Sequence, residues 1–253
     1  MESLAASGRY HFDTADAQTA LNASPAAAKQ ALSRLKKQGL IASPVRGFHV
    51  IVPPEYRSIG GPPADQFIPG LMRHLGLDYY VGLLSAAQYY GAAHHRPQEF
   101  QVFLVRNRRS ITCGAVRVVF IARKALKAVP TRSFNTPRGT IAVSSPEATA
   151  VDLAGYPEHA GGLDQVATVL SDLAETIDPT LLAKAAETAP LPWAQRLGYL
   201  LQVADADQII GPLRNYVEAA ARNYVWLAPS GADKGDHVRD WKLIINESVE
   251  PEF

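Results

Sequence analysis

Apolar side chains recur at helical spacing in one short segment near the start of the chain. The members of this apolar row are Ala28, Ala31, Leu32 and Leu35. Such spacing predicts an amphipathic helix. Ser24 can cap the N-terminus of this helix, and Pro25 fits its first position, where a missing N–H costs nothing. Gln38-Gly39 provides a natural end.

Shorter patterns flank this helix on both sides. Asp13 or Thr14 can cap a helix that runs to about Leu21, and Asn22-Ala23 makes a turn. After the main helix, residues 40–42 and 47–52 read as two strands around Ser43-Pro44-Val45-Arg46. The order helix, turn, capped helix and hairpin is that of a winged helix-turn-helix.

Beyond residue 52 the pattern changes to a mixture of strands and helices. Residues 53–63 are rich in proline and glycine, and we expect neither a helix nor a central strand there. Helices are expected at about 64–75, 80–90 and, after the cap at Ser145-Pro146-Glu147, from 145 to about 222. The predicted strands are residues 101–105, 116–121, 139–143 and 241–245.

These patterns predict an α/β (α+β) fold, in which an N-terminal winged helix-turn-helix is followed by a mixed, helix-rich α/β domain. The expected boundaries are 1–53 for the winged domain, 54–63 for a Pro/Gly linker and 64–253 for the C-terminal domain.

The chemistry of the capped helix suits the major groove of DNA. Residues 26–38 hold four basic side chains and no acidic one. Gln30 and Arg34 are suited to adenine and guanine edges, whereas lysines suit phosphates. A solvated basic helix in an ordinary domain is the alternative interpretation. The candidate DNA-binding residues are Ser24, Ala26, Lys29, Gln30, Ser33, Arg34, Lys36 and Lys37, with Arg46 at the hairpin tip as the wing contact.

The net charge of +1 hides a division along the chain. Residues 57–130 carry +7 and residues 131–253 carry −8. Most of the positive charge lies between Arg96 and Lys127, so Arg106, Arg108 and Arg109 are candidates for an extended DNA contact. Pairing with the acidic helices downstream is the alternative role for this stretch.

Neither the histidines nor the single cysteine form a recognisable catalytic or metal-binding pattern. The seven histidines never fall at metal-ligand spacing with acidic partners, and His94-His95 are adjacent. Cys113 has no identifiable catalytic partner, and no glycine-rich phosphate loop is present. We therefore expect no catalytic residues, no cofactor and no metal. The chain also has no apolar run long enough to span a bilayer and no signal-peptide pattern, which predicts a cytoplasmic protein.

Several motifs together resemble the AbiEi type of antitoxin and transcriptional regulator, which belongs to type IV toxin–antitoxin systems. The motifs are Ser24-Pro25-Ala26-Ala27 with Ala31 to Leu35, Tyr79 to Ala87, Ser145 to Leu153, Gly161-Gly162-Leu163-Asp164 and Gln195 to Leu201. They are spread over nearly the whole chain. Before Tyr10, such proteins usually have a fuller first helix than Met1 to Gly8 can supply.

The resemblance implies two activities and two partners. The winged domain would bind the promoter DNA of its own operon and repress it. The C-terminal domain would counteract a nucleotidyltransferase-like toxin, with or without direct contact. Two alternatives remain open: a winged domain that only docks on a protein, or a one-component regulator with a ligand cavity near Tyr79, Tyr80, Tyr89 and Tyr90.

Overall fold

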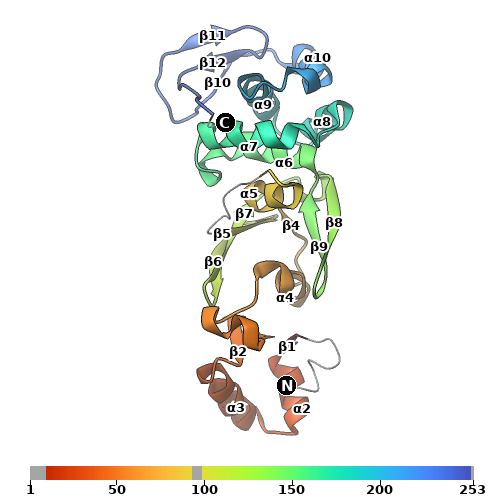
Figure 1. Ribbon diagram of the computed structural model, residues 1–253, viewed down its shortest axis with the longest axis vertical. Helices are drawn as coiled ribbons and strands as arrows, with labels where there is room; N and C mark the ends of the chain where they lie inside the picture. The colour runs from red at the N-terminus through yellow and green to blue at the C-terminus, as the bar shows by residue number, and fades with distance from the viewer. Residues whose placement is uncertain (1–9, 93–98, 252–253) are drawn as a thin grey trace. The chain divides into compact units, whose positions relative to one another are not determined.

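The computed structural model describes residues 10–92 and 99–251, which divide into two compact units (Figure 1). Of the described residues, the first unit contains 10–80, 99–126 and 133–142. The second unit contains 81–92, 127–132 and 143–251. Helices and strands are mixed in both, so the predicted α+β class is confirmed.

The first unit begins with a small module in the order β1-α2-α3-β2-β3. Its elements are β1 (His11–Asp13), α2 (Thr14–Leu21), α3 (Pro25–Lys37), β2 (Ile41–Val45) and β3 (Phe48–Ile51). The strand β3 lies between β1 and β2 and is antiparallel to both, with Phe12 opposite His49 and Ala42 opposite Val50. This small sheet and the two helices bury a shared apolar core.

The segment after β3 forms short helical turns before a regular helix. They are η1 (Pro54–Ile59), η2 (Ala64–Gln66) and α4 (Ile68–Leu75). The expectation that residues 53–63 hold no helix was therefore wrong. Pro54 takes the first position of η1, and Gly60 ends it with φ 73°, a left-handed conformation that glycine adopts easily.

Three neighbouring strands of the first unit have the order β6-β7-β5. The strand β5 (Glu99–Leu104) is parallel to β7 (Val116–Ala122), and β6 (Arg108–Cys113) is antiparallel to β7. The strand β6 packs against β2. The backbone N–H of Ala115 donates to the carbonyl of Ile59 at 2.7 Å, which fastens the β6–β7 turn to the end of η1.

The second unit is mainly helical. Its helices are α5 (Leu83–Ala87), α6 (Pro146–Gly155), α7 (Leu163–Ala174), α8 (Pro179–Ala186), α9 (Leu191–Val203) and α10 (Gly211–Ala220), with short turns η3 (Gln88–Tyr90), η5 (Pro157–His159) and η6 (Asp207–Ile209). The helix α6 packs against α5, α7, α8 and α9, and every residue from Pro146 to Ala154 is buried. Ser145 caps it by accepting a hydrogen bond from the N–H of Ala148, as expected.

A small C-terminal sheet is anchored to α9. It has the order β10-β12-β11, formed by β10 (Val225–Trp226), β11 (Asp236–Val238) and β12 (Leu243–Ile245). The buried amide nitrogen of Gln195 lies 3.1 Å from the carbonyl oxygens of Trp241 and Lys242. Gly198 faces the ring of Trp241, where any side chain would collide. The Gln195–Leu201 motif thus holds the end of the chain in place.

The boundary between the units passes through two neighbouring strands, β8 (Thr131–Thr136) and β9 (Gly139–Ser144). The strand β9 is parallel to β4 (Tyr80–Val81), with Val81 opposite Val143. The prediction of one helix over residues 80–90 was therefore wrong. Tyr80 and Val81 form a buried strand, and the helix begins only after Gly82.

Candidate nucleic-acid interface

The local sequence of α3 explains why the helix begins and ends where it does. The Ser24 hydroxyl accepts a hydrogen bond from the N–H of Ala27 at 3.3 Å, and Pro25 takes the first helical position. The last turn carries three basic side chains, Arg34, Lys36 and Lys37, where the helix dipole favours positive charge. Sequence reasoning gave the cap, the proline and the end of this helix correctly.

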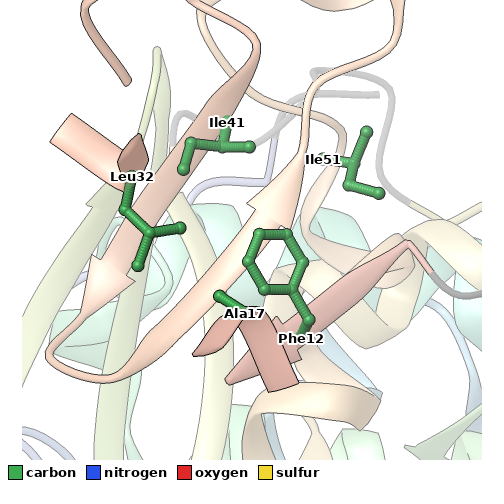
Figure 2. Packing of buried hydrophobic residues seen from close by; sticks show 5 residues of the cluster. All are labelled: Phe12, Ala17, Leu32, Ile41 and Ile51. Carbon is green, nitrogen blue, oxygen red and sulfur yellow. The ribbon is translucent and has the colours of Figure 1, made fainter. Parts of the chain in front are cut away.

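An apolar cluster fixes which face of α3 is turned inward (Figure 2). Leu32 of α3 packs with Phe12, Ala17, Ile41 and Ile51. These residues come from β1, α2, β2 and β3, so every element of the small module contributes to the cluster. Ala28, one turn before Leu32, has no exposed surface. The apolar row read from the sequence is thus the buried side of α3, and the opposite side is left to solvent.

All nine residues predicted to bind DNA near α3 and the hairpin are exposed. Ala26, Gln30, Ser33 and Lys37 lie opposite the apolar row, as the helical period requires. Lys29 and Lys36 lie at one edge of this exposed face, and Arg34 lies at the other. The structure therefore groups these residues on one solvent-facing surface that carries only positive charge.

A hollow of about 520 Å³ lies between α3 and the β2–β3 hairpin. Lys29 and Lys36 line it from α3, and Arg46 lines it from the hairpin turn. Gly47 completes that turn with φ 84°, a conformation that L side chains rarely adopt. The structure thus brings three of the predicted DNA-binding residues together around one concave site.

Sequence reasoning missed three polar residues in the same hollow: Thr14, Ser43 and His49. His49 is 8% exposed and lies on β3. Its Nδ1 is 2.9 Å from the Ser43 Oγ, and its Nε2 is 3.2 Å from the Thr14 Oγ1. The only sequence signal was one titratable residue inside the apolar run from Phe48 to Val52.

Burial lowers the pKa of His49 below its ordinary value of 6.5, and the nearby Lys36 ammonium lowers it further. The Asp13 carboxylate opposes this effect, while His74 adds to it. The imidazole is therefore neutral near pH 7, and one of its two nitrogens must accept a hydrogen bond from a neighbouring hydroxyl.

The three arginines proposed as an extended contact lie elsewhere in the first unit. Arg108 and Arg109 begin β6, Arg106 precedes it, and all three are exposed. The opposite end of β6 is Cys113, which packs on Gly61. None of the three arginines lines the hollow between α3 and the hairpin.

Other residues of interest have structural roles in the described part of the chain. Arg117 pairs with Glu99 at 2.9 Å. Tyr80 is buried and stacks on Phe103. The Tyr90 hydroxyl donates to the Ser144 carbonyl at 2.6 Å, and burial raises its pKa to about 12. These two tyrosines therefore serve the core and the backbone of the fold.

Residues 10–92 and 99–251 contain neither a metal-binding cluster nor a membrane-spanning helix. No group of three or more His, Cys, Asp or Glu side chains in these residues could hold a metal ion. None of their helices combines the length and apolarity needed to cross a bilayer. His94, His95 and Arg96 lie outside the described residues.

Comparison with known proteins identifies part of the chain. Residues 80–203 match the model of the AbiEi antitoxin C-terminal domain. A crystal structure of the RV2827C protein from Mycobacterium tuberculosis has the same fold, with a TM-score of 0.67 and 19% sequence identity. The match covers 96% of this chain and 88% of that one. No curated protein matches the chain. Over residues 80–203 the chain is therefore similar to the C-terminal domain of AbiEi antitoxins, the family that its sequence motifs resemble.

Proposed function

We propose that the chain is a DNA-binding antitoxin that represses its own toxin–antitoxin operon. In this proposal the module from β1 to β3 is a winged helix-turn-helix, α3 is its recognition helix and the β2–β3 hairpin is its wing. The antitoxin domain counteracts a nucleotidyltransferase-like toxin of the type IV class. The site of action is the cytoplasm.

The observation that carries the DNA-binding part is the exposed face of α3. Its side chains are small, polar or basic, and α3 contains no carboxylate. A helix that enters the major groove needs such a face, because phosphates attract cations and base edges need polar partners. The hollow beside it adds Arg46 from the hairpin, so helix and hairpin offer positive charge together.

The first experiment measures binding to the DNA just upstream of the gene over a range of salt concentrations. Wild type is compared with a Gln30→Ala, Arg34→Ala, Lys37→Ala triple variant. We expect tight, salt-sensitive binding by wild type. The variant should lose at least roughly thirtyfold in affinity, because each base contact is worth ~1–3 kcal/mol. Loss of Lys37 should also flatten the salt dependence.

A matched control removes one glutamine and two cations from exposed positions of the second unit. The control substitutions are Lys184→Ala, Lys234→Ala and Gln208→Ala. This variant has the same net charge as the triple variant and should bind like wild type. Two results would contradict sequence recognition by α3 and favour a protein-docking role for the module. One is that wild type binds unrelated DNA as tightly as the upstream DNA, and the other is that both variants lose the same affinity.

The antitoxin part of the proposal rests on the family match at residues 80–203. This part makes a prediction about the neighbouring genes that can be checked without purified protein. The gene should lie next to a gene for a nucleotidyltransferase-like protein, because toxin and antitoxin of this class are encoded together. A solitary gene would count against an operon of this kind and would favour a ligand-responsive regulator.

A further inference from the structure

The hollow between α3 and the hairpin has the composition of an anion site. Three cationic side chains, Lys29, Lys36 and Arg46, line it together with two hydroxyls, those of Thr14 and Ser43. The remaining lining residues within the described chain are apolar side chains, Gly47 and His49, and none is a carboxylate. Such a site favours a ligand with concentrated negative charge and several hydrogen-bond acceptors.

The geometry of a DNA complex indicates which anion this is. A helix in the major groove has one sugar–phosphate strand along each of its sides. Lys29 and Lys36 lie on the side of α3 that faces the hairpin, two helical turns and ~10.5 Å apart. A DNA strand whose backbone passes between α3 and the hairpin therefore places one of its phosphodiester groups at this hollow. This step rests on the DNA-binding function proposed above.

His49 controls how many hydroxyl groups can bind that phosphodiester. Its Nδ1 contacts the Ser43 hydroxyl, and its Nε2 contacts the Thr14 hydroxyl. In the neutral imidazole one nitrogen is an acceptor, so one of the two hydroxyls must donate its hydrogen to the ring. In the protonated imidazole both nitrogens donate, and both hydroxyl hydrogens can turn towards the hollow.

We propose that the hollow binds a backbone phosphate of DNA and that His49 is its positioning residue, which takes up a proton when the phosphate binds. The phosphate favours the proton in two ways. Its negative charge offsets the repulsion between Lys36 and the imidazolium, and its oxygens accept the two hydroxyl hydrogens that protonation releases.

The direction of the pH effect follows from the charges around His49. In the free protein its pKa is lowered by burial, Lys36 and His74, against an opposing effect of Asp13. Lys29 and Arg46 also face the hollow. A bound phosphate raises the pKa of His49 in the complex. The gain in DNA affinity is therefore complete at pH values below the pKa of His49 in the free protein. It is lost as the pH rises through the higher pKa that His49 has in the complex.

Calorimetry of the full chain tests the proposal with a duplex from the DNA upstream of its gene. Titrations in buffers of different ionisation enthalpy give the number of protons taken up, between about pH 5 and 8. We expect net uptake and an affinity that rises by up to about tenfold per pH unit lowered. His49→Gln should abolish this dependence, and Ser43→Ala should weaken it.

Two control variants separate His49 from the other histidines. His237→Gln replaces an exposed histidine of the second unit, and His74→Gln replaces an exposed neighbour of the hollow. Proton uptake should persist in both variants, and His74→Gln should shift its pH range upwards, because His74 helps to lower the pKa of His49. If His49→Gln fails to fold, the pKa of His49 is measured from the imidazole ¹⁵N signals of the wild-type protein with and without DNA. The proposal requires this pKa to be higher in the complex than in the free protein.

The possible results separate this inference from the function on which it rests. Specific binding with proton uptake that depends on His49 supports both. Specific binding whose pH dependence survives His49→Gln, or an unchanged His49 pKa in the complex, overturns the phosphate–proton linkage and leaves the DNA-binding function intact. No preference for the upstream DNA overturns both.

Discussion

Cys113 illustrates how strongly packing controls the chemistry of one side chain. Its side chain is 1% exposed at the end of β6, and burial raises the pKa of the thiol from 9.0 to about 12. A Cβ at Gly61 would lie 2.7 Å from the Cys113 carbonyl oxygen and 2.8 Å from its sulfur. The thiol is therefore enclosed, and the absence of a side chain at residue 61 is what allows this contact.

We predict that Cys113 is nearly inert towards thiol reagents while the protein is folded. Raising the pKa of the thiol from 9.0 to about 12 lowers the thiolate fraction at pH 8 about a thousandfold. Ellman's reagent should therefore react on the timescale of unfolding in buffer and at once in denaturant. Because the folded pKa is raised, this thiol favours the folded state below pH 9 and favours it less as the pH rises towards 12.

Gly61→Ala provides the structural control for this prediction. The added methyl group must displace the Cys113 backbone or sulfur, so the variant should be less stable and its thiol more reactive. Rapid labelling of the folded wild-type protein would contradict the enclosed environment of Cys113.

At the scale of elements, the sequence predicted segments whose ends carry strong local signals. A capping serine followed by proline marks the starts of α3 and α6 correctly. Six strands of the described residues were not predicted: β1, β4, β6, β8, β10 and β11. The strand β6 reads Arg-Arg-Ser-Ile-Thr-Cys, too polar to stand out, and it is a strand because β7 supplies its hydrogen-bond partners. Long-range pairing of this kind cannot be inferred from a local pattern.

The candidate site was predictable only in part for a related reason. The exposed side of α3 follows from its helical period, so its residues could be named from the sequence alone. The hollow depends on residues from α2, β2 and β3 that meet only after folding. His49 is separated from Thr14 by 35 positions in the chain, and nothing in either local pattern indicates their contact.

The strand β6 carries a prediction of its own. It is an edge strand whose first residues are exposed arginines, so it can follow DNA phosphates without reading bases. Replacing Arg106, Arg108 and Arg109 by glutamine should lower the slope of log affinity against log salt by up to ~3, with little change in sequence preference. Arg117→Gln is the control, because Arg117 already pairs with Glu99. An unchanged slope in the triple variant would show that β6 lies outside the DNA footprint.

At the scale of the whole molecule, the two proposed activities rest on different stretches of the chain. The exposed face of α3 and the hairpin lie within residues 24–51, before the family match at residues 80–203 begins. The charge boundary falls inside the family match, because residues 57–130 carry +7 whereas residues 131–253 carry −8. Positive charge suits the phosphates of DNA, and acidic helices suit a protein partner with basic surface.

This division predicts that DNA binding and toxin neutralisation can be separated by mutation. The Gln30→Ala, Arg34→Ala, Lys37→Ala variant changes only exposed side chains, so the protein should fold normally and still neutralise the toxin. The test expresses toxin and antitoxin from two independent promoters, so that repression of the operon cannot contribute, and measures growth. Wild type and the variant should rescue growth equally, whereas repression of a reporter by the native promoter should be lost in the variant. If the variant is folded and present at wild-type levels yet fails to rescue growth, then toxin neutralisation requires DNA binding. That result would contradict the separation of the two activities.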